Sequence, residues 1–390
     1  MARPVIPQEI IDHIIDGYEG LPRLGGTEED AAGLVREDRQ LFGEWNPRCI
    51  RRPLTRFSLV ARNWLPRSRY HLFSAPVVRI NQDKYNSLRR LLDTPQKALG
   101  SIGPFIRHVT ISSPCPSIFL PSYFPVLEEL TLQGSLTLRQ VQALMLSIPT
   151  LRKVGFKWVK LAIPPMEEEV ARGKHPSVDT LRTIDTMSTS LQAFTWLDKV
   201  KPAHAISTLR VSGLYPDQIG NLSKFLASMA SSLQHLEISS LRGSAIGDCE
   251  TSLARGLNLG RLKQLESLTL PTVSLLTPEE INNLDQHVIH AVDFLIVMLR
   301  TLPASSKLKT LTISANEGDL AHFPWEDLAT TLCRNSFAAL ESLVFVDWTV
   351  KDEARVPEVE AFINQCLSRI AARGILKIQF ENLDNTTADL

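Results

Sequence analysis

The sequence predicts an α/β repeat fold, a horseshoe in which short parallel strands line one face and helices or loops line the other. A six-residue pattern with apolar residues at its first, fourth and sixth positions recurs along the chain, as in residues 265–270. The fourth and sixth positions face the same side of an extended strand, so each copy has one apolar face. Most intervals between copies leave room for a helix. A short strand can bury its apolar face only against neighbouring copies, which predicts an elongated stack.

Nine clear copies predict nine strands. They lie at residues 106–111, 127–132, 151–156, 191–196, 206–211, 233–238, 265–270, 308–313 and 340–345. Weaker copies surround Val78 and Ile80 near the start and Ile378 and Phe380 near the end. The first positions of successive clear copies are 15 to 43 residues apart, and the shortest interval, between residues 191 and 206, leaves room only for a loop.

The pattern resembles the leucine-rich repeat, whose motif is L-x-x-L-x-L-x-x-N/C-x-L. Residues 308–316 carry the first nine positions, with Asn316 at the asparagine position. The other clear copies have neither Asn nor Cys there, and several intervals exceed the roughly 20 to 29 residues of that family. The resemblance implies an irregular leucine-rich-repeat solenoid over residues 75–381, with parallel strands on a concave face and helices and loops on a convex face.

Apolar residues at helical spacing predict helices between the strands. One runs over residues 138–148, because Thr137 is a favourable N-terminal cap and Pro149 ends the pattern. Further helical stripes cover residues 219–229, 281–299 and 359–370. Prolines and consecutive glutamates predict an exposed excursion at 162–176, and a polar tail at 382–390 is expected to be frayed.

Two segments ahead of the repeats also show helical spacing. Residues 6–15 read IPQEIIDHII, and residues 57–73 read FSLVARNWLPRSRYHLF. Together they resemble the F-box, a small helical module through which substrate receptors dock to the Skp adaptor of cullin-RING ubiquitin ligases. The first is similar to that family's L-P-x-E-L-L-x-x-I-F, and VARNW in the second is similar to its V-C-(K/R)-x-W. The closing Leu72-Phe73 matches the family's final apolar-aromatic pair.

The F-box resemblance implies a helical module over residues 1–74, with an insertion at about 17–56 that is longer than in compact members. The insertion is either a loop on an intact module or a disruption of its adaptor surface. The implied adaptor-binding residues are Pro7, Ile10, Ile11, Ile14, Leu59, Val60 and Trp64. The resemblance thus implies a non-catalytic, SCF-type substrate receptor whose repeats hold a protein substrate. The alternative is a protein-binding repeat scaffold whose N-terminal helices only cap the first repeat.

Candidate substrate-binding residues occupy the third and fifth positions of the pattern, which form the open face if the fourth and sixth positions point into the core. They are His108, Glu129, Lys153, Arg210, His235 and Glu237. Charges of both signs disfavour a surface dedicated to phosphate. A protein or peptide partner, held by shape and dispersed polar contacts, suits such a face better.

The amino-acid composition argues against several classes of function. The 42 basic and 42 acidic residues balance, so no net field favours nucleic acid or membrane. We interpret the arginine-rich, aromatic stretch at 45–82 as a solvated face or a contact for an acidic partner. The five scattered cysteines and the absence of a signal-like N-terminus predict a reducing compartment, the cytoplasm or nucleus. No catalytic motif occurs, and His287 and His290 lack further ligands at useful spacing, so neither enzyme activity nor a cofactor or metal is predicted.

Overall fold

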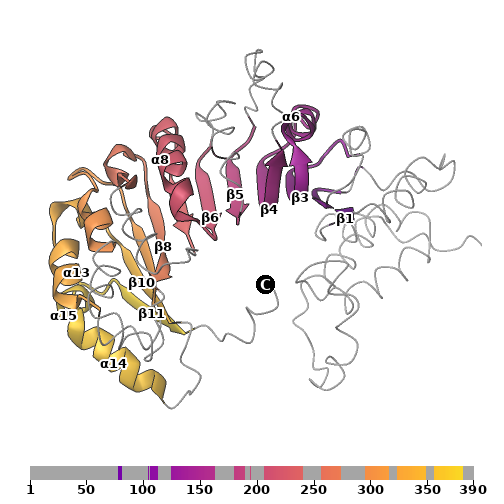
Figure 1. Cartoon of the computed structure of the whole chain (residues 1–390). Coiled ribbons are helices and arrows are strands. Elements are labelled where there is room, and N and C mark those ends of the chain that lie inside the picture. Colours follow the sequence, from indigo (N-terminus) through magenta and orange to yellow (C-terminus); the bar gives the residue numbers. More distant parts are fainter. Residues whose placement is uncertain are drawn as a thin grey trace, which may run out of the picture. The chain divides into compact units, whose positions relative to one another are not determined.

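The computed structural model describes residues 78–80, 104, 106–112, 124–162, 180–188, 194, 206–239, 256–273, 295–315, 323–347 and 355–380. The chain forms two compact units, Met1–Gly155 and Phe156–Leu390. The boundary falls inside strand β4 (Lys153–Ala162). Each unit is of the α/β class and is built from parallel strands (Figure 1).

The first unit holds β1 (Val78–Ile80), β2 (His108–Ser112) and β3 (Glu129–Thr137), followed by helix α6 (Leu138–Leu146) and the start of β4. The strands pair in parallel in sequence order, with Val109 opposite both Val78 and Leu130. Thr137 starts α6 with a capping box: its hydroxyl accepts from the Gln140 amide, while the Gln140 side chain accepts from the Thr137 amide. The predicted start of this helix is therefore confirmed.

The second unit holds seven further strands. They are β5 (Thr183–Met187), β6 (Thr208–Ser212), β7 (His235–Ile238), β8 (Ser267–Val273), β9 (Thr310–Ala315), β10 (Ser342–Asp347) and β11 (Leu376–Phe380). All are paired in parallel in sequence order, and the sheet is open because β11 pairs only with β10. The predicted α/β class with parallel strands in sequence order is confirmed.

The helices of the second unit lie on one side of these strands (Figure 1). Those with both ends described are α8 (Ile219–Ser228), α13 (Trp325–Leu332), α14 (Val356–Cys366) and α15 (Ser368–Ala371), with the 3₁₀ turns η4 (Pro216–Gln218), η5 (Leu259–Arg261) and η6 (Asn335–Phe337). Residues 295–300, at the end of the helical stripe predicted at 281–299, are helical as well. The helical stripe predicted at 359–370 is divided between α14 and α15 at Leu367, while the one predicted from residue 219 is α8.

The core lies between the strands and these helices. Residues at the first, fourth and sixth positions of the pattern form continuous rows because neighbouring strands pair in register. Leu268, Leu311 and Leu343 form one such row across β8, β9 and β10, and each is 0% exposed. Burying a leucine fully contributes about 1.5–3 kcal/mol relative to leaving it exposed. Repetition of the pattern therefore supplies most of the driving force for this stack.

One predicted strand is wrong. Residue 194, inside the expected strand 191–196, is helical, and the Phe194 ring packs 6.3 Å from the Phe225 ring in the core. The strand that the pattern missed is β5, whose core positions are Leu181, Ile184 and Thr186. Thr186 is buried, and its hydroxyl donates to the Arg210 carbonyl at 3.3 Å, so a polar residue occupies a position where the pattern requires an apolar one.

Four copies of the pattern share a left-handed residue, which lies inside β3 and β4 and directly follows β5 and β6. The eighth residue, counted from the first apolar position of the copy, has a positive φ in Gly134 (84°), Trp158 (50°), Ser188 (47°) and Gly213 (66°). Glycine adopts this conformation freely, whereas any other L-residue loses roughly 1–2 kcal/mol there. Trp158 and Ser188 are therefore strained at a position where two other copies carry glycine.

The adaptor-binding residues, the F-box-like module over 1–74 with its insertion, and the tail at 382–390 lie outside the described residues.

Candidate binding face of the sheet

The open face of each sheet is the side that carries the third and fifth positions of the pattern. Parallel pairing in register sets residues of the same position side by side on neighbouring strands, as with His108 and Glu129 or Arg210 and Glu237. Side chains that are far apart in the sequence therefore form rows across the strands. The candidate substrate-binding residues lie in such rows in both units.

In the first unit the row of third positions converges on Glu129. His108 Nε2 lies 3.5 Å from Glu129 Oε1, and Lys153 Nζ lies 3.7 Å from Glu129 Oε2. All three side chains are partly exposed. The structure thus brings together the three candidates of this unit around one carboxylate, although they are up to 45 residues apart in the sequence (153 − 108 = 45).

The neighbouring row of fifth positions in the first unit is uncharged and tightly packed. Thr110 and Thr131 pair in register, and Thr110 is buried. A Cβ added at Gly155 would lie 3.0 Å from Thr131 Oγ1, so this glycine permits a close approach to the threonine.

In the second unit the residues at the fifth position are charged, and two carboxylates lie beside the guanidinium of Arg210. Arg210 Nε lies 3.1 Å from Glu237 Oε2, and Arg210 NH1 lies 3.8 Å from Asp185 Oδ1. Asp185 was missed by the sequence pattern because the pattern missed the whole strand β5. Two of the candidates, Arg210 and Glu237, therefore form a direct ion pair, and Asp185 extends the row by one strand.

His235, the remaining candidate, occupies a third position and pairs in register with Thr208 and Ser267. It is exposed, and its positive charge when protonated favours the ionised form of nearby Glu266. It is not in the Asp185–Arg210–Glu237 row.

A further charged row precedes the strands and was not among the sequence candidates. Arg107 NH1 lies 2.9 Å from Glu128 Oε1 in the first unit, and Lys309 Nζ lies 2.8 Å from Glu266 Oε2 in the second. The hydrogen bond from Lys309, followed by its charge, lowers the pKa of the Glu266 carboxyl, and the same hydrogen bond raises the pKa of Lys309. The sequence signal for these pairs is opposite charge at the second positions of two neighbouring copies, as in Arg107 and Glu128 or Glu266 and Lys309.

Over strands β8 and β9 of the second unit, the open face carries serine and threonine hydroxyls. Ser267 pairs with Thr310, and Thr269 pairs with Thr312, on β8 and β9. All four residues are only partly buried. The open face of this unit therefore has a charged part over β5–β7 and a neutral hydrogen-bonding part over β8 and β9.

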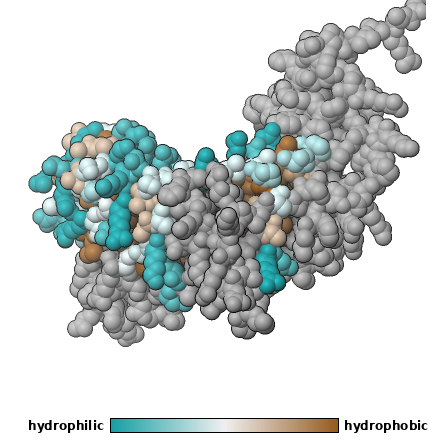
Figure 2. Space-filling model, turned by 90° about the horizontal axis from the view of Figure 1, so that it is seen from above, coloured by the Kyte–Doolittle hydropathy of each residue, from teal (hydrophilic) through white to brown (hydrophobic). Residues whose placement is uncertain are grey.

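In these rows each carboxylate has a cation beside it. No group of three or more metal-ligating side chains occurs within the described residues. Hydrophilic residues cover most of the described surface seen in Figure 2.

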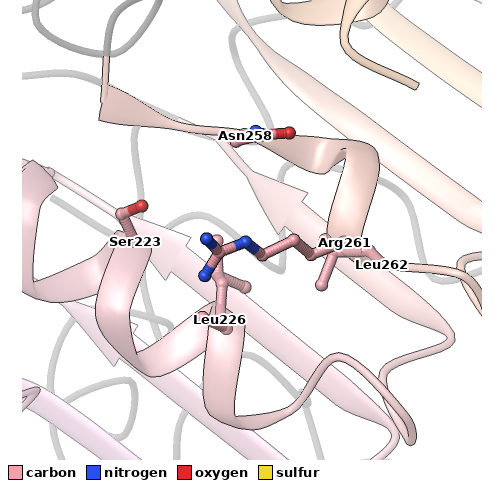
Figure 3. A pocket seen from close by; sticks show the side chains of 6 residues that line it. Ser223, Leu226, Asn258, Arg261 and Leu262 are labelled. Atoms are coloured by element: carbon pink, nitrogen blue, oxygen red, sulfur yellow. The ribbon is translucent and has the colours of Figure 1, made fainter. Parts of the chain in front are cut away.

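One small cavity of about 130 Å³ lies away from the open face, beside α8 and η5. It is lined by Ser223, Leu226, Ala227, Asn258, Arg261 and Leu262, with the Arg261 side chain extending toward Leu226 (Figure 3). The Asn258 side chain is already engaged, because its Oδ1 accepts from the Gly260 amide at 2.8 Å. The cavity is too small for a cofactor.

No protein-family model matches the chain, and no curated protein matches it significantly. Among the described residues, no helix has the length and apolar character needed to cross a membrane.

Proposed function

We propose that the chain is an irregular leucine-rich-repeat protein that recognises a protein partner on its open face and catalyses no reaction itself. The observation that carries this proposal is the pair of ion-paired rows, His108–Glu129–Lys153 and Asp185–Arg210–Glu237, which expose charges of both signs on the open faces of parallel sheets. Dispersed polar groups on a rigid, partly exposed surface are suited to complementary side chains of a protein.

We further propose that the N-terminal segments are an F-box through which the chain acts as a substrate receptor of a cullin-RING, SCF-type ubiquitin ligase in the cytoplasm or nucleus. This part rests on the resemblance of residues 6–15 and 57–73 to the two halves of that module. A Skp-type adaptor would bind Pro7, Ile10, Ile11, Ile14, Leu59, Val60 and Trp64, and the repeats would present the substrate to a separate enzyme.

Co-purification of the full chain with a Skp-type adaptor tests the receptor role. The double substitution Ile10→Glu and Ile14→Glu places charges on the predicted apolar stripe and should abolish adaptor recovery while the repeats keep their unfolding temperature. Gln8→Glu with His13→Glu, on the same segment but off the stripe, is the matched control and should leave recovery unchanged. Equal recovery with both pairs of substitutions would refute the receptor role.

The alternative is a repeat scaffold whose N-terminal helices only cap the first repeat. It predicts no adaptor recovery from the wild-type chain. It also predicts that Ile10→Glu with Ile14→Glu lowers the unfolding temperature, because a cap contributes to stability through its apolar face.

A further inference from the structure

The left-handed position that four copies of the pattern share is occupied by a tryptophan in β4. Gly134, Trp158, Ser188 and Gly213 share the eighth position of their copies, and all have φ between 47° and 84°. In β4 the residue with the largest side chain thus occupies a backbone conformation for which glycine is the unstrained choice.

The turn directs Trp158 away from the core. Phe156 and Val159 in β4 are both 0% exposed, and the two residues between them are exposed. Strict alternation from Phe156 would have placed Trp158 in the core. The left-handed residue instead interrupts the alternation and adds one residue to the exposed side. The alternation then resumes, and Lys160 is exposed again.

The result is a segment with three exposed side chains, those of Lys157, Trp158 and Lys160. Trp158 is 41% exposed and makes no ring contact with another aromatic residue of the described chain. Lys157 and Lys160 are exposed, and neither has an ion-pair partner within the described residues. Tryptophan is enriched among the residues that dominate binding energy at protein interfaces, and a residue held by a tight turn loses little conformational freedom on binding.

We propose that Lys157, Trp158 and Lys160 bind an acidic segment of the protein partner, in which carboxylates pair with the two lysines and an apolar side chain packs on the indole. The charge of the segment supports this occupant, because Lys157 and Lys160, which have no ion-pair partner among the described residues, flank the exposed ring. Single-stranded nucleic acid is less suitable, because its sequence-tolerant binding uses several stacked aromatic rings along a basic groove, whereas this segment offers one indole and two lysines. The inference rests on the protein-recognition part of the proposed function and does not depend on adaptor docking.

Selection from a random-peptide display library on the full chain tests the proposal, followed by affinity measurement with the resynthesised peptides. Peptides held by the wild-type chain should be rich in Asp and Glu around an apolar residue. Trp158→Gly should weaken their binding at least about tenfold, as expected for an interface anchor. Lys157→Glu with Lys160→Glu should weaken it further, through repulsion of the acidic peptides.

Ser188→Gly is the matched control, because it relieves the same backbone strain at the same position of the next strand without removing the indole. It should leave peptide affinity unchanged. Both glycine variants should unfold at denaturant concentrations equal to or above that of the wild type. Trp158→Asn is a second variant for the case in which Trp158→Gly does not fold, because asparagine also tolerates the left-handed conformation.

Selected peptides that bind wild type and Trp158→Gly equally, or that are not acidic, would overturn the inference. If their binding responds instead to Arg210→Glu, the proposed protein recognition stands and only this site is wrong. Failure to select any peptide contradicts both. Trp158-dependent binding of a fluorescent single-stranded RNA, without peptide binding, would overturn the acidic-segment proposal in favour of nucleic acid.

Discussion

The buried and open sides of the same strands follow different rules. On the buried side, Leu268, Leu311 and Leu343 repeat one residue type across three strands with no exposed surface. On the open side, the fifth positions of the second unit change from Asp185, Arg210 and Glu237 to Thr269 and Thr312. Stability requires the same apolar contact in every copy. A binding surface requires different groups in different places, and only the open side can vary without creating cavities.

The largest expected effect lies on the buried side. Leu311→Ala removes a side chain from the centre of a continuous leucine row and should lower the free energy of unfolding by about 2–5 kcal/mol. Chemical denaturation measures it. Thr312→Ala, the next residue on the open face, is the control and should change stability by no more than about 0.5 kcal/mol. Similar losses for the two variants would remove the distinction between the two sides.

A smaller effect on stability is expected at glycines on the side of the sheet that carries the helices, where an added Cβ would meet backbone atoms. A Cβ added at Gly260 in η5 would lie 2.7 Å from the Thr301 carbonyl oxygen, so Gly260→Ala should destabilise by roughly 1–3 kcal/mol. Gly220 in α8 has nothing within 4 Å of such a Cβ, and Gly220→Ala should stabilise by about 0.5–1 kcal/mol, since alanine favours the helix. Thermal unfolding of the pair should show shifts of opposite sign; shifts of equal sign would contradict the packing at Gly260.

The charged row of the open face should matter less to stability. Arg210→Glu breaks two partly exposed ion pairs and should change the free energy of unfolding by about 1 kcal/mol. Adding Glu237→Arg restores an opposite-charge pair, and a double-mutant cycle in low salt should show positive coupling that decreases as salt is raised. A loss as large as that of Leu311→Ala would mean that the row supports the fold rather than faces a partner.

The smallest expected effect concerns the pH dependence of the Glu266–Lys309 pair. The pKa of Glu266 lies below its ordinary value of 4.5, so its contribution to stability is present above that pH and is lost as the pH falls through the folded-state pKa. The pKa of Lys309 lies above its ordinary value of 10.5, so its contribution is present below that pH and is lost as the pH rises further. Glu266→Gln should therefore make the unfolding temperature slightly less sensitive to acid. Because both side chains are partly exposed to solvent, an unchanged profile at low salt would show that the hydrogen bond does not persist in solution.

Most strands were predictable because their signal is local and repeated. Strand β9 is predicted by Leu308, Leu311 and Ile313 alone, without the rest of the chain. A strand with apolar residues on one face must bury that face wherever it occurs. The start of α6 was predictable for the same reason, because Thr137 caps the adjacent turn. These features depend on residues that are neighbours in the sequence.

Strand β5 was not predictable from an apolar pattern. Thr186 is accepted in the core because the Arg210 carbonyl of the next strand accepts its hydrogen bond, and that carbonyl is 24 residues away in the sequence. The opposite error occurred at Phe194, where an apolar residue three positions after another suits a helix as well as a strand. Packing against Phe225 is a tertiary contact that the local pattern does not contain.

By itself, then, the amino-acid sequence determined the class of the fold, the position of most strands and the polar character of the open face, because these follow from the periodicity of side chains along a strand. Only the tertiary structure decided which charges meet around Glu129 and Arg210, which strand tolerates a buried threonine, and that Trp158 turns outward. Each of those outcomes depends on the register between strands, or on a backbone conformation, and neither is encoded by the spacing of apolar residues within one copy.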